Sequence, residues 1–292
     1  MSTESIYNID PVSQYWEVLE GRIKYSGTKS LATMGQINYN FNGETVVITG
    51  ASSGIGREVA IHFADAGATV VNGDLVAEPD HVDVATHELI ENRGGTSTYV
   101  ETDVTEQADL VSLIEAAHQY GGVDVMVNNA GVNFRKSVLN ITPEEFESGQ
   151  RVNLAGPLFG TQIAAKDMID RDSAGKIINT ASIRTDVALS GQVMYNATKG
   201  GVKMLTKSAA LDLADYGIRV NAVAPGRTVT ALADTTQNAD EMADSGELEK
   251  QIPMERPART EQIAPTFLYV ASEAADYMTG EVVTIDGGLS VY

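Results

Sequence analysis

The sequence contains no cysteine, so it can form no disulfide and offers no thiolate for catalysis. It has no apolar run approaching the about 18 residues that a membrane-spanning helix needs. Its first ten residues lack the basic start and apolar stretch of a signal peptide. We therefore expect a cytoplasmic protein that has no membrane span.

Basic residues are also scarce: 20 lysines and arginines stand against 40 aspartates and glutamates, for a formal charge of −20. Because nucleic acids and many membrane surfaces are anionic, we expect this protein to bind neither. Near 1 M salt the Debye length falls to about 3 Å, which makes dense surface carboxylates tolerable. The charge and the few lysines thus favour a halophilic source, and the alternative is an ordinary acidic enzyme.

Residues 1–42 differ in composition from the rest of the chain. They hold the only tryptophan, Trp16, and several tyrosines, and the stretch 26–40 is polar with no clear period. We expect an extension ahead of the main domain. Its amphipathic piece, 15–23, can pack on the domain or on a neighbouring subunit; the alternative is a loosely ordered tail.

From residue 43 to residue 292, apolar runs rich in β-branched residues alternate with helical patterns. Continuous apolar strands between amphipathic helices indicate a parallel sheet covered on both faces. We predict an α/β fold, a single doubly wound Rossmann-type domain with a parallel seven-stranded sheet. The expected strands lie within 44–50, 68–74, 97–104, 123–131, 176–182, 218–226 and 281–288, and helical patterns cover 56–67, 108–121 and 200–217.

A glycine-rich turn follows the first expected strand directly and leads into a helical pattern. A glycine motif alone is weak because turns collect glycine, but a strand before it and a helix after it make it specific. Gly50 permits the tight turn, Gly54 lets the backbone approach a pyrophosphate, and Gly56 allows the helix to pack closely on the strand. The phosphates of a dinucleotide then lie at the positive end of the helix. The turn reads Thr49-Gly50-Ala51-Ser52-Ser53-Gly54-Ile55-Gly56.

Asp74 ends the second expected strand, 18 residues after Gly56. This is close to the offset of about 20 residues at which an acidic side chain binds the adenosine ribose. A carboxylate there repels the 2′-phosphate of NADP, and the next residue, Leu75, brings no positive charge. We predict NAD as the cofactor; the alternative is a surface aspartate that merely ends a strand.

A tyrosine and a lysine four residues apart, Tyr195 and Lys199, lie on one face of a helix. An unperturbed tyrosine titrates near pH 10, and a nearby cation favours the phenolate and lowers that value toward neutral pH. Ser182 ends the strand at 176–182, where its hydroxyl can polarise a substrate oxygen. Asn153 is a helical amide that can hold a water connecting Lys199 to solvent.

In combination these motifs resemble the short-chain dehydrogenase/reductase family in its compact form, from Asn42 to Tyr292. The resemblance implies that Tyr195 is the general acid/base, that Lys199 also holds the nicotinamide ribose, that Ser182 positions the reacting oxygen and that Asn153 supports a proton relay. It also implies a homotetramer. The motifs are the turn at 49–56, Asp103-Val104, Asn128-Asn129-Ala130-Gly131, Asn153, Ser182, Tyr195 with Lys199, Pro225-Gly226 and IDGG at 285–288.

The resemblance also places residues around the cofactor. Asp103 and Val104 would flank the adenine, the segment 128–131 would line the cofactor bed, and Thr230 would meet the nicotinamide carboxamide. Thr228 departs from the family, which usually has Ile or Val there. The predicted cofactor-binding residues are Gly50, Ser52, Ser53, Gly54, Ile55, Gly56, Asp74, Leu75, Asp103, Val104, Asn129, Ala130, Gly131, Tyr195, Lys199, Pro225, Gly226, Thr228 and Thr230.

Three arginines, Arg135, Arg184 and Arg227, fall where the family places substrate-facing loops. An arginine fork suits a carboxylate, sulfonate or phosphate, and similar stretches occur in dehydrogenases of sugars and sugar acids. We therefore consider an anionic substrate; the alternative is that these arginines pair with surface carboxylates or at subunit contacts. The acidic stretch 231–251 corresponds to a mobile lid in the family, and it is also compatible with a solvated pair of surface helices.

The leading hypothesis is an NAD-dependent dehydrogenase that oxidises a secondary alcohol of a sugar, sugar acid or related polyol, a small-molecule alcohol/carbonyl couple with no metal. The second hypothesis is a ketone reductase of the 3-oxoacyl-carrier type. That class prefers NADPH and presents a basic docking patch, which Asp74 and the net charge disfavour. A catalytically inactive dinucleotide sensor is the third, and the complete set Asn153, Ser182, Tyr195 and Lys199 disfavours it.

Overall fold

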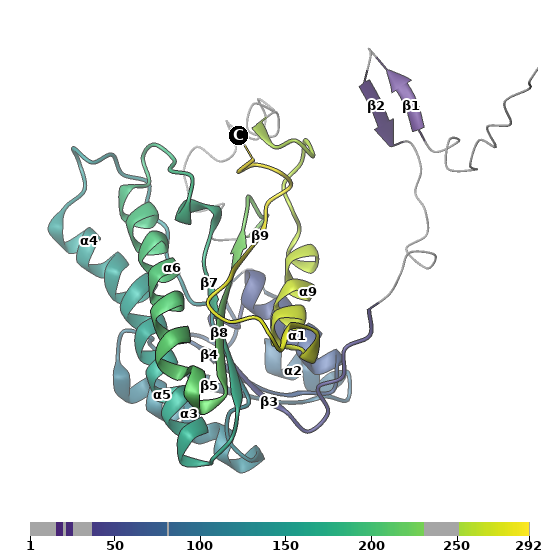
Figure 1. Cartoon of the computed structure of the whole chain (residues 1–292), viewed down its shortest axis with the longest axis vertical. Helices are drawn as coiled ribbons and strands as arrows, with labels where there is room; N and C mark the ends of the chain where they lie inside the picture. The colour runs from purple at the N-terminus through teal and green to yellow at the C-terminus, as the bar shows by residue number, and fades with distance from the viewer. Residues whose placement is uncertain (1–15, 20–21, 26–36, 81, 231–250, 292) are drawn as a thin grey trace, which may run out of the picture. The chain divides into compact units, whose positions relative to one another are not determined.

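The computed structural model describes residues 16–19, 22–25, 37–80, 82–230 and 251–291 (Figure 1). The chain divides into two compact units, Met1–Asn38 and Tyr39–Tyr292. In the first unit, β1 (Trp16–Leu19) and β2 (Arg22–Tyr25) form an antiparallel pair in which Trp16 lies opposite Tyr25. The amphipathic piece at 15–23 therefore contributes to a small β-hairpin. The second unit begins four residues ahead of the predicted start at 43.

The second unit is built on a parallel sheet of seven strands in the order β5-β4-β3-β6-β7-β8-β9. Each strand falls on or overlaps one of the expected apolar runs, and the predicted doubly wound α/β fold is confirmed. The chain direction across the sheet reverses between β3 and β6, which makes this pair the topological switch point. The strands are β3 (Thr45–Thr49), β4 (Thr69–Asp74), β5 (Thr96–Glu101), β6 (Val125–Asn128), β7 (Gly175–Thr180), β8 (Ile218–Pro225) and β9 (Val282–Ile285).

Helices connect the strands on both faces of the sheet. The helical pattern at 200–217 is part of a longer helix that starts at Val193, so Tyr195 and Lys199 lie in its first two turns. None of the helices in the described ranges is long and apolar enough to cross a membrane. The helices are α1 (Gly54–Asp65), α2 (Thr86–Asn92), α3 (Gln107–Ala117), α4 (Pro143–Gln150), α5 (Gly156–Asp170), α6 (Val193–Leu213) and α9 (Thr260–Ala271).

Alternate side chains of the apolar strands enter two different cores, because successive residues of a strand point to opposite faces. Val46 and Ile48 of β3 pack with Phe63 of α1 and Phe267 of α9. Val47 lies in the other core, with residues of α3 and α5. Figure 1 shows α1, α2 and α9 on one side of the sheet and α3, α5 and α6 on the other. Both faces of the strands are thereby buried, as their continuous apolar sequences predict.

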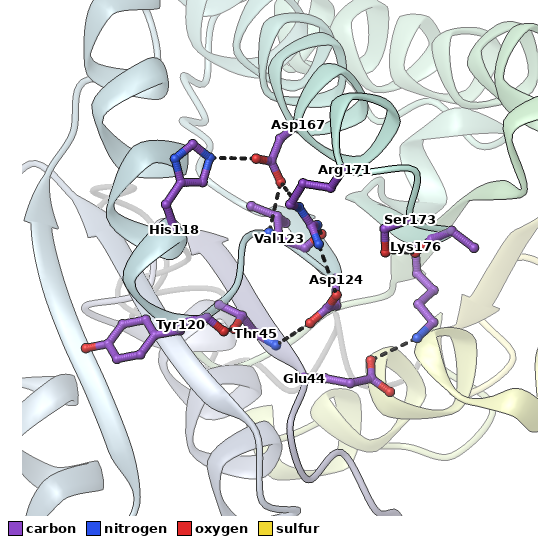
Figure 2. A network of polar contacts seen from close by, with 11 residues as sticks. Glu44, Thr45, His118, Tyr120, Val123, Asp124, Asp167, Arg171, Ser173 and Lys176 are labelled. Carbon is purple, nitrogen blue, oxygen red and sulfur yellow. Dashed lines mark hydrogen bonds and ion pairs between the residues drawn. The ribbon is translucent and has the colours of Figure 1, made fainter.

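A network of paired charges closes the edge of the sheet at which the strands begin (Figure 2). The Asp167 carboxylate accepts hydrogen bonds from Val123 N at 3.0 Å and Arg171 Nε at 3.0 Å, and it contacts His118 Nε2 at 2.6 Å. Arg171 also lies 3.9 Å from Asp124. Burial works against the charge of Asp167, but the hydrogen bonds prevail and lower its pKa. This edge is held together by ion pairs, and the opposite edge is where the predicted site residues lie.

Candidate active site

The predicted site residues gather at the carboxyl edge of the sheet, because the parallel strands all end there. The glycine-rich turn follows β3, Asp74 ends β4, the segment 128–131 follows β6, Ser182 follows β7 and Pro225 ends β8. Ligands of open α/β sheets bind outside this edge, at the switch point that β3 and β6 form here. The topology thus brings together motifs that are far apart in the sequence.

Two glycines of the turn are required by close backbone approaches. Gly50 has φ +67°, and a Cβ on it would lie 2.8 Å from Ala130 Cα. A Cβ on Gly56 would lie 2.0 Å from Gly50 O and 2.4 Å from Asn129 Nδ2. Neither site has room for a side chain, so the turn packs directly against the segment after β6.

No described side chain caps the N-terminus of α1. Ser53 precedes the helix in an extended conformation, and its side chain makes no capping hydrogen bond. The first N–H groups of a helix have no partner within the helix, and the helix dipole makes this end positive. A turn of glycines and small residues, followed by an uncapped helix, fits the pyrophosphate of a dinucleotide.

The Asp74 carboxylate is fixed between the glycine turn and the end of β4. Its Oδ2 accepts a hydrogen bond from Ser52 N at 2.9 Å, and its Oδ1 accepts one from Leu75 N at 2.8 Å. Burial raises the pKa of Asp74, and the hydrogen bonds from Ser52 and Leu75 act in the opposite direction. Leu75 itself is 61% exposed. The carboxylate is therefore held in place where the ribose of a dinucleotide is expected.

Two threonines anchor the segment that follows β6. Thr49 Oγ1 accepts hydrogen bonds from Asn129 N at 3.0 Å and Ala130 N at 3.2 Å. Asn129 Nδ2 donates to Gly50 O at 3.1 Å, and Asn129 Oδ1 accepts a hydrogen bond from Thr180 Oγ1 at 3.2 Å. The Asn129 side chain thus ties together the ends of β3, β6 and β7. Thr180 was not among the predicted site residues.

Asn153 lies on a π-helical turn, Arg151–Ala155, between α4 and α5, and its side chain is fully buried. Its Oδ1 accepts a hydrogen bond from Val132 N at 2.8 Å, and its Nδ2 donates to Val132 O at 2.8 Å. Nδ2 also lies 3.3 Å from Thr198 Oγ1 of α6. Asn153 therefore joins the segment after Gly131 to the helix that carries Tyr195.

Ser182, Tyr195 and Lys199 lie together at the ends of β7 and α6. Tyr195 hydrogen-bonds to Ser182. Lys199 is buried, and its Nζ donates to Thr180 O at 2.6 Å and lies 5.6 Å from the centroid of the Tyr195 ring. Burial lowers the pKa of Lys199 to about 8.

The electrostatics of Tyr195 differ from the sequence-based expectation. Burial raises the pKa of Tyr195, and the effects that lower it come from the hydrogen bond with Ser182 and the charge of Arg184. Lys199 directs its ammonium to the Thr180 carbonyl, so Arg184 is the cation that acts on the tyrosine. The sequence predicts that Lys199 lowers the pKa of Tyr195, whereas in the structure that pKa is raised and the opposing charge comes from Arg184.

The loop after β8 reaches the glycine turn. The Thr230 side chain lies 3.5 Å from the position that a Cβ on Gly54 would occupy. Gly226 has no room for a side chain, because its Cβ would lie 2.6 Å from Asp286 Cα, and Thr228 Oγ1 donates to Gly226 O at 3.2 Å. Pro225, Gly226, Thr228 and Thr230 are thus brought to the same edge as the turn.

Asp103 and Val104 follow β5 at the far side of the same edge. Asp103 Oδ1 accepts a hydrogen bond from Thr105 N at 2.8 Å, and Val104 is buried against Gly156 at the start of α5. Ile55 of the turn packs against the core on the α1 side. These three side chains lie at the carboxyl edge of the sheet, where the cofactor is expected.

Of the three predicted arginines, the structure brings two together. Arg184 interacts electrostatically with Tyr195 and with Arg135. Arg227 is not among the groups that act on Arg184; its backbone carbonyl accepts a hydrogen bond from Ala258 N at 2.9 Å. Only part of the predicted cationic cluster therefore faces the tyrosine.

Comparisons with known proteins identify the family. A family model described as enoyl-(acyl carrier protein) reductase matches residues 50–290. The crystal structure of a short-chain type dehydrogenase/reductase from Mycobacterium marinum superimposes with a TM-score of 0.80 at 34% identity, covering 87% of this chain and 98% of that one. The chain belongs to the short-chain dehydrogenase/reductase family.

Two other relatives in this family carry more specific names. Glucose 1-dehydrogenase 2 of Bacillus subtilis is 33% identical over 87% of this chain and 97% of its own length. A candidate 2-deoxy-D-gluconate 3-dehydrogenase from Agrobacterium tumefaciens, solved with bound NADP, superimposes with a TM-score of 0.78 at 31% identity over 88% of this chain and 100% of that one.

Several contacts of this dehydrogenase/reductase site could not be assigned from the motifs. Thr49, Thr180 and Thr198 position Asn129, Lys199 and Asn153 through hydroxyl or carbonyl oxygens. Each of these threonines stands within two residues of a motif residue in the sequence. Threonine is common at strand ends and in helices, so this proximity alone does not predict the contacts. The predicted lid covers residues 231–251, and all of these except Gln251 lie outside the residues that the structure describes.

Proposed function

We propose that this chain is an NAD-dependent oxidoreductase that oxidises a secondary alcohol of a sugar, sugar acid or related polyol to a carbonyl. The observation that carries the proposal is the hydrogen-bonded pair Ser182 and Tyr195 beside the buried Lys199. Members of this family use a nicotinamide cofactor, and relatives include proteins named as glucose and deoxygluconate dehydrogenases.

One group of residues at the carboxyl edge would bind the cofactor, and another would bind the substrate. The glycine turn and the uncapped end of α1 would hold the pyrophosphate, Asp74 the adenosine ribose, and the segment 129–131 with Thr230 the nicotinamide half. When bound, the dinucleotide supplies the hydride acceptor. Tyr195 takes the proton of the alcohol as general base, and Ser182 holds the reacting oxygen by a hydrogen bond. Lys199 would hold the ribose, and its ammonium would place a positive charge beside the tyrosine.

The choice of NAD over NADP rests on Asp74. Its carboxylate is held by Ser52 N and Leu75 N, so it cannot turn away from a 2′-phosphate without losing both hydrogen bonds. A charge fixed there would repel that phosphate. The relative from Agrobacterium tumefaciens was solved with bound NADP, so the preference of this chain for NAD has to be measured. If the enzyme uses NADP at least as efficiently as NAD, judged by kcat/KM, the preference is refuted.

A reductase acting on a carrier-bound ketone is the second candidate, because the matching family model is described as an acyl-carrier-protein reductase. The net charge of −20 disfavours docking of an acidic carrier. Reduction of acetoacetyl-CoA with NADPH, at rates above those of NAD-linked sugar oxidation, would favour this candidate.

The decisive experiment replaces the general base. Tyr195→Phe keeps the ring and removes the hydroxyl, so turnover on a panel of sugars, sugar acids and simple alcohols should fall by about 10²–10⁴-fold. NADH binding, followed by fluorescence, should change little. Retained turnover in this variant would refute the mechanism.

We also propose a homotetramer, a cytoplasmic location and adaptation to high salt, as the resemblance and the acidic composition imply. Light scattering of the purified enzyme at low and high KCl tests the first, and activity assays at the same salt concentrations test the third. A tetramer with activity that rises with salt is the expected result; a monomer, or an enzyme inhibited by salt, would contradict the corresponding proposal.

A further inference from the structure

Arg184 is held against the proposed reaction centre by its own backbone. It lies on a short 3-10 turn, Ile183–Thr185, directly after Ser182, and its backbone N donates to Ser182 Oγ at 3.2 Å. Its Nη1 donates to Val187 O at 3.2 Å, which fixes the direction of the side chain. The guanidinium is half-buried and interacts with the Tyr195 hydroxyl. Arg184 therefore presents a positive charge beside the atom that would receive the substrate proton.

No carboxylate among the described residues pairs with Arg184. The nearest one in the sequence, Asp186, pairs instead with Lys203 and accepts a hydrogen bond from Thr185. The charge that does face Arg184 is of the same sign, from Arg135. A half-buried cation without a counter-ion lowers the stability of the fold. The chain has 40 acidic residues, so a lack of carboxylates does not explain why Arg184 is unpaired in the described structure.

Two amide side chains beside the start of α6 have hydrogen-bond acceptors without a partner in the described structure. Gln192 is 5% exposed, and within the described part of the chain its Oε1 has no hydrogen-bond partner; the same holds for the buried Asn133 Oδ1. A backbone bridge between Lys136 and Gln192 places the loop that carries Asn133 beside the start of α6, three residues before Tyr195. Asn196 Oδ1 on α6 and Asn72 Oδ1 inside β4 also have no partner in the described residues, so it is the position of Gln192 and Asn133 beside Tyr195 that makes these two acceptors available to substrate hydroxyl groups.

We propose that the substrate is a hydroxy acid whose carboxylate binds Arg184, with its hydroxyl groups donating to Gln192 and Asn133. This inference rests on the proposed function and names the substrate class of the same site. In the reaction the carbinol hydrogen leaves as hydride to the nicotinamide and the hydroxyl proton goes to Tyr195. The carboxylate is unchanged, and the product is an oxo acid.

The position of Arg184 places the carboxylate beside the groups that would hold the reacting alcohol. Arg184 lies two residues after Ser182, and its backbone N donates to Ser182 Oγ at 3.2 Å. A carboxylate bound to Arg184 and an alcohol bound to Ser182 and Tyr195 therefore belong to one small molecule. The substrate class is accordingly a hydroxy acid, with further hydroxyl groups where the substrate is a sugar acid.

The test compares acids with neutral alcohols that differ only in the carboxylate. D-Gluconate is paired with sorbitol, and 3-hydroxybutyrate with 1,3-butanediol, each assayed for NAD reduction. In the wild type we expect the acid of at least one pair to have the higher kcat/KM. A hydrogen-bonded contact to a charged group is worth enough to change that ratio by about 10- to 150-fold.

Arg184→Gln is the main variant, since it removes the charge and keeps a polar side chain. Loss of the Arg184 charge also alters Tyr195, but this effect slows the acid and its neutral partner alike, so their ratio isolates the carboxylate contact. We expect the acid-to-neutral ratio to fall by about 10- to 150-fold and to recover partly in Arg184→Lys. Arg93→Gln is the matched control, because Arg93 pairs with Asp65 on the surface at the edge where the strands begin; its ratio should be unchanged.

Each result bears on the proposal. Equal losses on acid and neutral alcohol in Arg184→Gln, with normal NADH binding and melting temperature, would overturn the carboxylate site. Tyr195-dependent turnover of neutral alcohols alone would overturn it too and leave the proposed function standing. Failure of the wild type on every acid, sugar and alcohol would reject the proposed function itself.

Discussion

Replacement of Lys199 by methionine should make the protein more stable while abolishing turnover. Lys199 is 4% exposed, and its Nζ has one hydrogen-bond acceptor in the described structure, the Thr180 carbonyl. Burial without a counter-ion disfavours the charged form. Methionine has nearly the same length and shape and carries no charge, so it removes that cost and keeps the packing.

The size of the gain follows from the pKa of Lys199. A fall from the ordinary 10.5 to about 8 corresponds to a cost of about 3.4 kcal/mol in the charged state. Methionine leaves the Thr180 carbonyl without its hydrogen bond, which costs about 1–3 kcal/mol. We therefore expect a net gain of about 1 kcal/mol at pH 7, or a rise of about 2–4 °C in Tm for a domain of this size.

The pH dependence gives the stricter test. Because the pKa of Lys199 is lower in the folded state, the unfolded chain binds more protons between pH 8 and 10.5. The stability of the wild type relative to Lys199→Met therefore rises with pH across this interval and is lowest and constant below pH 8. Urea denaturation of both proteins without cofactor, from pH 6.5 to 10, measures this difference directly.

The control is Lys176→Met, since Lys176 is less buried and pairs with Glu44 at 2.8 Å. Its loss should destabilise slightly, by about 0–1 kcal/mol, and the difference from wild type should not change between pH 7 and 9.5. A flat difference for Lys199→Met, or a loss of stability at pH 7 that exceeds the cost of the unpaired carbonyl, would refute the assigned electrostatics.

Two further substitutions test the two edges of the sheet. Gly56→Ala places a Cβ 2.0 Å from Gly50 O, so the turn must shift; we expect NADH binding, measured by fluorescence titration, to be lost, and wild-type affinity would contradict the close approach. Asp167→Asn removes the negative charge that pairs with Arg171. It should lower the free energy of unfolding by about 1–3 kcal/mol in urea denaturation at pH 7. Since the folded pKa of Asp167 is lowered, that deficit should persist above about pH 4 and disappear as the pH falls through the folded pKa. A deficit independent of pH would mean that the charge is not the cause.

The sheet and its glycine turn were predictable because they depend on local signals. A buried parallel strand is a continuous apolar run, and Gly50 and Gly56 stand where the backbone leaves no room for a side chain. The β1–β2 hairpin was not predictable from the amphipathic pattern at 15–23 alone, since so short a pattern fits a helix face or a strand equally well.

The polar contacts of the site were harder to predict than its motifs. The sequence predicts Asn153 as an amide that can hold a water, and it gives no sign that its side chain holds both backbone groups of Val132, 21 residues away. Lys199 was expected to act on Tyr195, but a carbonyl at the end of a neighbouring strand attracts its ammonium. Such contacts depend on where the strand ends meet in space, which spacing along the chain does not specify.

Among the described residues, charged side chains are paired at one edge of the sheet and two cations are unpaired at the other. Where the strands begin, Asp167, Arg171 and Asp124 form contacts of opposite sign, and these stabilise the fold (Figure 2). Where the strands end, Lys199 and Arg184 are buried or half-buried and no described carboxylate faces them, so each lowers stability. A fold retains such a cost when a bound group offsets it. With a dinucleotide and a hydroxy acid bound, Lys199 would gain hydrogen bonds to the ribose and Arg184 would gain a carboxylate, so binding and stability would be coupled through the same two residues.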